Sequence, residues 1–229
     1  MARRRKSQKQ QEETLIDLVE ARDKAQNFFE DNQKLILGLV GGLLILVGGY
    51  FAYRQLYQQP REKEAMAAMY QAEVQFERDS FALALENPGG GNDGFLDIID
   101  KYSGTPTANV AKYYAGVCWL HLGEYEAAVD MLKGFSAEGD VLGVMKHAAL
   151  GDAYAELGNM SEAESQYKKA TSSSGTDFVK AYAFQKLGLF LESQGNASKA
   201  AEAYSTIKRD YPNTPQAQDI DKYLSRVGG

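Results

Sequence analysis

The chain has 229 residues, 44% of them hydrophobic, and 31 acidic against 25 basic side chains give it a formal net charge of −6. This length and apolar content suffice for one domain with its own core plus a membrane anchor. The acidic excess argues against a nucleic-acid-binding protein, and a single cysteine excludes a framework of disulfides.

Residues 1–34 form a basic tail that carries eight Lys and Arg side chains, including the run Arg3–Lys6. Within it, residues 14–33 predict an amphipathic helix. Two interpretations stay open: the helix extends the following apolar segment into the cytosol, or its apolar side contacts a partner or the lipid surface. We expect residues 1–34 to be a cytoplasmic tail.

Residues 35–53 predict a transmembrane helix. They are 19 uncharged residues between Lys34 and Arg54, and at 1.5 Å per residue they span roughly 28 Å, close to the hydrocarbon thickness of a bilayer. No small-residue cleavage site follows, so we expect an anchor and not a cleaved secretory signal. The basic tail predicts a cytoplasmic N-terminus, with residues 54–229 in the periplasm of a bacterium and the span in its inner membrane.

Glycines recur along one side of this span. Gly38 and Gly42 form a GxxxG pair, and Gly49 continues the same side. Such a stripe predicts close packing against another membrane helix. The alternative is that these glycines have no partner, because glycine is common in membrane helices.

A spacing of glycines and alanines occurs three times in residues 106–213, with offsets of 35 and 37 residues between copies. In each copy a second glycine follows the first after seven residues, and an alanine follows five residues later. The marker residues are Gly116, Trp119, Gly123 and Ala128 in the first copy; Gly151, Tyr154, Gly158, Ala163 and Tyr167 in the second; and Gly188, Gly195, Ala200, Tyr204 and Pro212 in the third. Such a period is typical of a helix–turn–helix repeat, and the small residues predict a close approach between its two helices.

These spacings resemble the tetratricopeptide repeat (TPR) family. The resemblance implies an all-α fold in which helix pairs stack into a right-handed superhelix. It also implies that the protein is a binding scaffold and not a catalyst. Two family features are weak here: only Phe184 supplies the bulky residue near the start of the first helix, and Pro212 is the only closing proline.

Further elements extend the array at both ends. Residues 61–86 predict the first helix of a partial copy, residues 87–94 a loop, and residues 216–226 a single capping helix that covers the last apolar face. The expected repeats are 61–105, 106–140, 141–175 and 176–213, with a cap at 214–229. Thr105 is expected to cap a helix that begins at Pro106, and in the second full repeat Ser161 and Glu164 predict a capping box.

No group of residues in the sequence predicts catalysis. His121 and His147 lack partners at metal-ligand spacing, and Cys118 is expected to be a small buried apolar residue. We therefore expect no enzyme activity, cofactor, metal or small-molecule substrate, and protein partners instead.

The TPR resemblance also implies which side chains line the concave groove. They are Tyr113, Val117 and Leu120 in the first full repeat, Ala148, Asp152 and Ala155 in the second, and Gln185, Leu189 and Glu192 in the third. The Lys, Asn and Arg with which some family members hold a terminal carboxylate are missing from these positions. A mixed aromatic and acidic groove suits apolar or basic extended segments.

The N-terminal part of the chain, residues 1–80, resembles the start of YfgM-type proteins. The similarity lies in residues 28–34, the glycine-rich span, Tyr53–Arg54 and a charged helix rich in alanine at residues 65–68. It implies a single-pass inner-membrane protein that accompanies the SecYEG translocon and a periplasmic chaperone, and that hands unfolded secreted proteins onward. The alternative comes from the Tyr-x-x-Thr-Pro-x-Ala segments at Tyr102 and Tyr211, which resemble TPR adaptors of Tol–Pal-associated and outer-membrane-assembly machinery.

Overall fold

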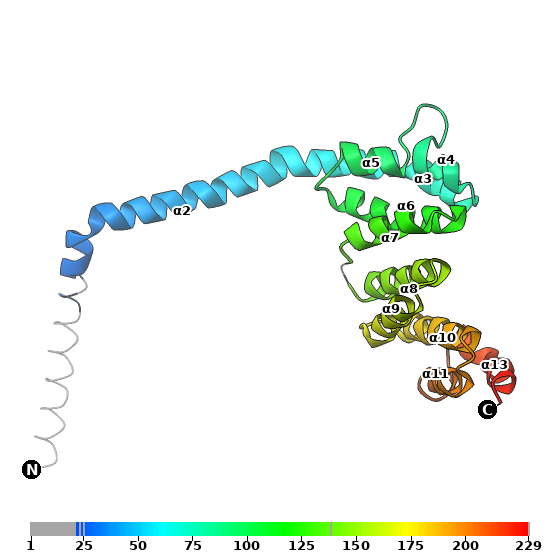
Figure 1. The fold of residues 1–229 in the computed structure, drawn as a ribbon. Coiled ribbons are helices and arrows are strands. Elements are labelled where there is room, and N and C mark those ends of the chain that lie inside the picture. Colours follow the sequence, from blue (N-terminus) through cyan, green and yellow to red (C-terminus); the bar gives the residue numbers. More distant parts are fainter. Residues whose placement is uncertain (1–21, 23, 25, 138, 229) are drawn as a thin grey trace, which may run out of the picture. The chain divides into compact units, whose positions relative to one another are not determined.

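The structure is a computed structural model that describes residues 22, 24, 26–137 and 139–228. The described residues form helices and turns without a strand (Figure 1), which confirms the predicted all-α class. The chain divides into two compact units, Met1–Gln59 and Pro60–Gly229.

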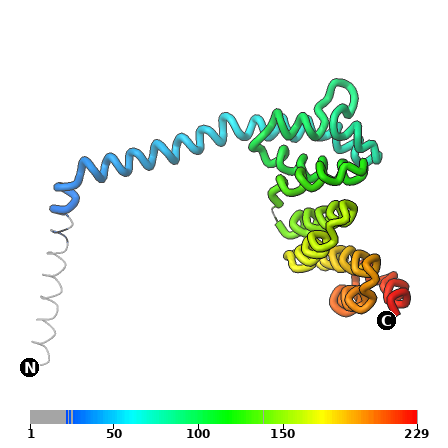
Figure 2. Tube along the Cα trace, viewed as in Figure 1, coloured from blue at the N-terminus to red at the C-terminus, as the bar shows by residue number. Residues whose placement is uncertain are grey.

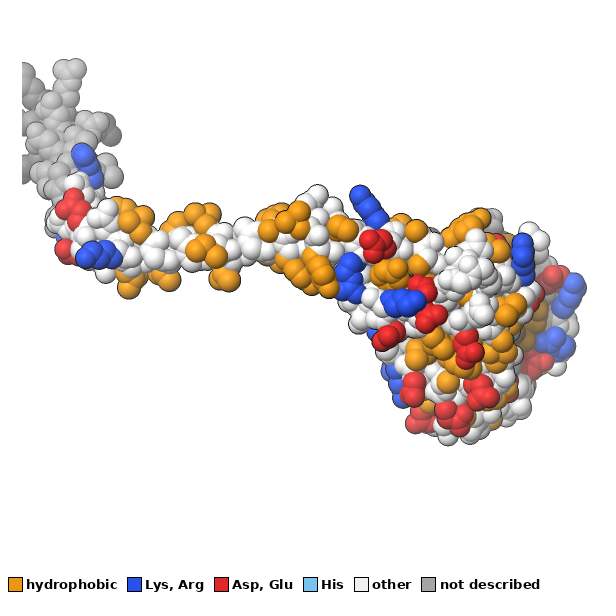
Figure 3. Space-filling view, turned by 90° about the horizontal axis from the view of Figure 1, so that it is seen from above, with side chains coloured by type: hydrophobic (Ala, Val, Ile, Leu, Met, Phe, Trp, Pro, Cys, Tyr) orange, Lys and Arg blue, Asp and Glu red, His pale blue; other side chains and the backbone are white. Residues whose placement is uncertain are grey.

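The first unit contains the apolar helix α2, Gln33–Tyr53, followed by a π-helical turn, η1, at Arg54–Gln58. None of the residues of α2 is buried. Among the described residues, the one segment long and apolar enough to cross a membrane lies within the helical residues Gln33–Glu77. Figure 3 shows the span as hydrophobic and uncharged side chains between two charged ends.

Half of the predicted tail helix, residues 14–21, 23 and 25, lies outside the described residues, as does the run Arg3–Lys6. Residues 26–31 are helical, but Asn32 interrupts the helix with φ −109° and ψ 11°. Its side-chain nitrogen donates to the carbonyl oxygen of Phe28 at 2.9 Å. Residues 26–31 therefore do not continue into the span as one unbroken helix.

Helices also make up the second unit, in a simple order along the chain. They are α3 (Gln59–Glu77, which begins at the unit boundary), α4 (Phe81–Glu86), α5 (Phe95–Lys101), α6 (Pro106–Leu122), α7 (Tyr125–Gly134), α8 (Asp140–Glu156), α9 (Met160–Ser172), α10 (Asp177–Ser193), α11 (Ala197–Asp210), α12 (Pro215–Gln218) and α13 (Ile220–Arg226). Helices α6 and α7, α8 and α9, and α10 and α11 pack as pairs, and each pair contacts the next. The first helices also touch one another, α6 on α8 and α8 on α10. Figure 2 shows how the helices of this unit follow one another in the order of the chain.

Small residues set the distance between the two helices of each pair. A Cβ atom added to Gly151 would lie 2.6 Å from Cε1 of Tyr167, and one added to Gly116 would lie 2.6 Å from Cγ of Leu132. Only hydrogen fits in these places, because carbon atoms normally stay about 3.5–4.0 Å apart. Ala163, the marker on the second helix, is fully buried.

The structure corrects three predicted helix boundaries. Residues 61–86 are not one helix, because the chain turns between α3 and α4 at Asp79, which has φ +56°. The cap is not one helix either, since Asp219 separates α12 from α13. The predicted capping box at Ser161 is wrong: the helix begins at Met160 after Asn159, and Glu164 instead pairs with Lys168 at 2.6 Å. Thr105, in contrast, accepts a hydrogen bond from the backbone nitrogen of Ala108, so the predicted cap is confirmed.

Two lysines join successive repeats. Lys146 of α8 donates to the carbonyl oxygens of Phe135 and Lys133 at the end of α7. Lys180 of α10 donates in the same way to Thr171 and Ser173 at the end of α9. Each ammonium group thereby satisfies carbonyl groups that a helix end leaves without a partner, and burial lowers the pKa of both lysines.

Candidate functional site

The first helices of the array border a hollow of about 470 Å³. Its wall comes from α3, α6, α8 and α10, so four segments far apart in the sequence meet there. Aromatic and aliphatic side chains dominate, and the lining residues are Phe76, Tyr113, Tyr114, Val117, Leu120, His121, Met145, Ala149, Asp152, Tyr182 and Lys186.

Aromatic contacts hold one wall of the hollow in place. The rings of Phe76 and Tyr114 meet edge to face with centroids 5.0 Å apart, and Tyr113 packs against Phe135 at 5.5 Å. His121 stacks on the ring of Phe81 at 4.2 Å. Rings in such contacts lose little further freedom when a ligand arrives, so the wall is preorganised.

Asp152 is the polar centre of the hollow. Its carboxylate accepts hydrogen bonds from the hydroxyl of Tyr167 at 2.6 Å and from the ammonium of Lys186 at 2.7 and 2.9 Å. The same ammonium lies 6.0 Å from the centre of the Tyr182 ring. Burial, reinforced by the charge of Asp152, raises the pKa of Tyr182 to about 12, so its hydroxyl stays protonated.

Four of the predicted groove residues line this hollow together: Tyr113, Val117, Leu120 and Asp152. The groove residues predicted in the third repeat do not line it. The amide of Gln185 donates to the hydroxyl of Tyr223 at 3.4 Å, and Glu192 forms two 2.8 Å hydrogen bonds with Arg226.

Two of the three groove positions predicted in the third repeat, Gln185 and Glu192, therefore contact side chains of the capping helix α13. Leu189 is 39% exposed but lies outside the hollow. In the second repeat, Ala148 and Ala155 are also not lining residues, because Ala148 is buried in the core and Ala155 packs against the next repeat's core.

Seven residues that line the hollow are not among the predicted groove residues: Phe76, Tyr114, His121, Met145, Ala149, Tyr182 and Lys186. The repeat spacing offered a signal for five of them. Met145 and Tyr182 each lie six residues before a repeat glycine, and Tyr114, Ala149 and Lys186 each lie two residues before one. Equivalent positions in a stacked repeat face the same side. Phe76 belongs to the partial copy, where no marker glycine fixes the position.

Other candidate residues are engaged in packing. His147 shares a hydrogen bond of 2.8 Å with Gln166, and Cys118 is fully buried. Across the described part of the chain, no group of His, Cys, Asp or Glu side chains could hold a metal ion.

A larger hollow of about 710 Å³ lies beside the turn before α6 and the segment after α7. Asn109 and Ser136, two of its lining residues, hydrogen-bond to each other in both directions at 2.8 Å. None of the predicted groove residues lines this hollow.

Paired helices stacked in sequence order, with an aromatic hollow on the side of their first helices, define a helical-repeat scaffold. Comparison with protein families matches residues 148–215 to the tetratricopeptide repeat family. That match runs from within α8 to the start of α12, and it covers most of the second predicted full repeat and all of the third. The repeats therefore indicate a protein–protein interaction scaffold. No curated protein and no solved structure matches the chain.

Proposed function

We propose that this protein is a membrane-anchored scaffold that binds other proteins through the hollow on its first helices. The observation that carries the proposal is the convergence of Tyr113, Met145 and Tyr182 from three separate repeats onto one concave surface. Concave, mostly apolar surfaces with a few placed polar groups are the usual form of binding sites. Asp152 and Lys186 supply those polar groups here.

The proposed setting is a bacterial inner membrane, with residues 1–34 in the cytoplasm, α2 across the bilayer and the repeats in the periplasm. The length and composition of α2 and the basic tail support this topology. The similarity of residues 1–80 to YfgM-type proteins supports an ancillary role at the SecYEG translocon, in which secreted proteins pass to a periplasmic chaperone. A role as an adaptor in Tol–Pal-type or outer-membrane-assembly machinery is the competing proposal.

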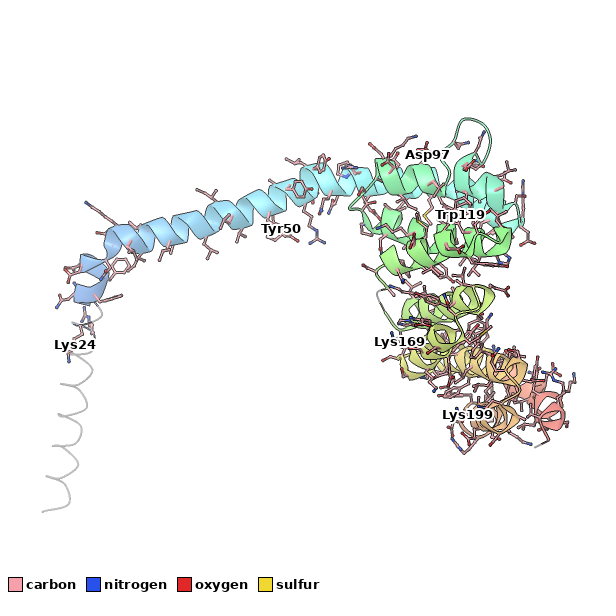
Figure 4. The ribbon with its side chains drawn as sticks, in the orientation of Figure 1. Lys24, Tyr50, Asp97, Trp119, Lys169 and Lys199 are labelled. Carbon is pink, nitrogen blue, oxygen red and sulfur yellow. The ribbon has the colours of Figure 1, made fainter. Side chains whose placement is uncertain are left out.

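Site-specific photocrosslinking in living cells tests the binding surface. A photoreactive residue at Val117 should crosslink to partner proteins, whereas the same residue at Lys169 on the outer helix α9 (Figure 4) should not. Mass spectrometry of the products separates translocon and chaperone components from envelope-assembly components. Equal crosslinking from both positions would refute the hollow as the binding surface.

Protease added to spheroplasts tests the topology. Residues 61–229 should be digested while the tail stays protected. Survival of the repeats until the cells are lysed would reverse the proposed orientation.

The glycine side of the span is proposed to hold a membrane partner. A Cβ atom added at Gly38, Gly42 or Gly49 would meet nothing of this chain within 4 Å, so bulk placed there should disturb only contacts to another molecule. Replacing Gly38 and Gly42 with Leu should release the protein from a membrane complex on a native gel while the repeats stay folded. A complex that survives this change would place the anchor contact elsewhere.

A further inference from the structure

The charged groups around the aromatic hollow are mainly acidic. Glu73 and Glu77 flank Phe76 on α3, and their charges add to burial in raising the pKa of Tyr114. Glu156 lies one turn beyond Asp152 on α8, on the same side of the helix. Lys186 is the one ammonium that lines the hollow, and Asp152 already neutralises it.

These glutamates occupy costly places. Glu77 and Glu156 are the last residues of α3 and α8, and neither helix has a basic residue in its last turn. A carboxylate at a helix C-terminus is unfavourable because it meets the negative end of the helix dipole. Glu156 has the phenol of Tyr125 as a neighbour, and the charge of the glutamate, together with a hydrogen bond between the two side chains, raises the pKa of Tyr125. Among the described residues, neither glutamate has an ion-pair partner.

The third repeat shows what such a carboxylate binds. Glu192, near the end of α10, receives both a 2.8 Å bond from Nε and a 2.8 Å bond from a terminal nitrogen of Arg226. The guanidinium also lies 4.6 Å from the centre of the Tyr223 ring, and the hydroxyl of Tyr204 completes the carboxylate's contacts at 2.8 Å. A glutamate beside tyrosine rings at the end of a first helix thus binds an arginine that comes from outside the helix pair.

Resting on the proposed function, we infer that the hollow selects an extended segment of a partner protein in which arginine or lysine alternates with apolar residues. The apolar side chains enter the aromatic hollow between Tyr113 and Tyr182, and the basic groups reach Glu77 and Glu156 at its rim. Guanidinium groups suit this site because they bind carboxylates and lie on tyrosine faces at the same time. An acidic segment is disfavoured, because Lys186 has no charge left unpaired to offer it.

Peptide binding to the full-length protein in an uncharged detergent tests the inference. Three fluorescent, C-terminally amidated peptides are compared by anisotropy: one alternates leucine with arginine, and in the others glutamine or glutamate replaces every arginine. The arginine peptide should bind best, and its affinity should fall as salt rises.

Variants assign the selectivity to the rim. The double variant Glu77→Gln, Glu156→Gln should weaken binding of the arginine peptide about two- to tenfold, since each exposed ion pair contributes little. Its affinity for the glutamine peptide should stay unchanged. The matched control combines Glu126→Gln with Glu162→Gln on the outer helices α7 and α9. It should change the affinity for neither the arginine peptide nor the glutamine peptide. The rim variant should fold normally, because it removes charges that oppose the helix dipoles.

The outcomes separate this inference from the proposed function. Equal binding of all three peptides, lost on Tyr113→Ala with Tyr182→Ala, would keep the hollow as a binding site and overturn its selectivity for basic segments. Preferred binding of the glutamate peptide would also overturn it. Self-association that the arginine peptide competes away would make a second copy the occupant instead of a separate partner. If none of the three peptides binds and position 117 forms no crosslink in cells, the hollow is not a binding site.

Discussion

Replacing Gly151 with alanine should destabilise the repeats, although alanine is the better helix former. The new Cβ atom on α8 would lie 2.6 Å from Cε1, 2.7 Å from Cδ1 and 2.8 Å from Cζ of Tyr167 on α9. The ring would have to retreat by about 1 Å to reach ordinary contact distance. It has little room, because Tyr167 is 4% exposed, its hydroxyl is bonded to Asp152, and its ring lies 5.1 Å from that of Phe190.

Two opposing terms set the size of the effect. Overpacking a close-packed site costs about 1–3 kcal/mol, and exchanging glycine for alanine inside a helix returns about 0.5–1 kcal/mol. The balance is a loss of roughly 0–2.5 kcal/mol in the free energy of unfolding, centred near 1 kcal/mol. For a unit of this size that loss lowers the melting temperature by a few degrees.

Thermal unfolding of the full-length protein in an uncharged detergent measures this loss. The fluorescence of Trp119, the only tryptophan of the chain, reports on the repeats because it packs beside Leu150. Gly143→Ala is the matched control on the same helix, where an added Cβ atom would meet nothing within 4 Å, and it should stabilise by up to about 1 kcal/mol. If Gly151→Ala raises the melting temperature as much as Gly143→Ala does, the close approach of α8 and α9 is wrong.

Three further predictions concern a buried alanine, an ion pair of the cap and the buried cysteine. Ala163→Leu should cost about 1–3 kcal/mol because Ala163 is fully buried, and an unchanged melting temperature would place it on the surface. Arg226 lowers the pKa of Glu192 below its usual 4.5, so the stability that this pair gives the cap is present above pH 4.5 and lost as the pH falls through the lowered value. The protection factors of residues 220–226, which correct hydrogen exchange for its slower intrinsic rate in acid, should therefore fall as the pH is lowered, and Glu192→Gln should show the reduced protection already at pH 7. Burial raises the pKa of Cys118 to about 12, so a maleimide should label it only after unfolding, and rapid labelling of the folded protein would show that the site opens.

The sequence alone determined the contacts within each helix pair. Gly116, Gly151 and Gly188 each face the residue sixteen positions later, namely Leu132, Tyr167 and Tyr204. A contact over so short a stretch depends only on two helix lengths and one turn, so the same spacing recurs in every copy. The apolar span is equally evident from sequence, because nineteen uncharged residues need no tertiary partner to be recognised.

Only the tertiary structure decided what lies between the pairs. The hollow joins Tyr113, Asp152 and Lys186 from three repeats, and the break at Asp219 lets α13 place Arg226 against Glu192, 34 residues away in the chain. Such contacts depend on the rotation between successive helix pairs and on where the terminal helix bends. A repeat period specifies neither, because it fixes which residues are equivalent and not how one pair is turned on the next.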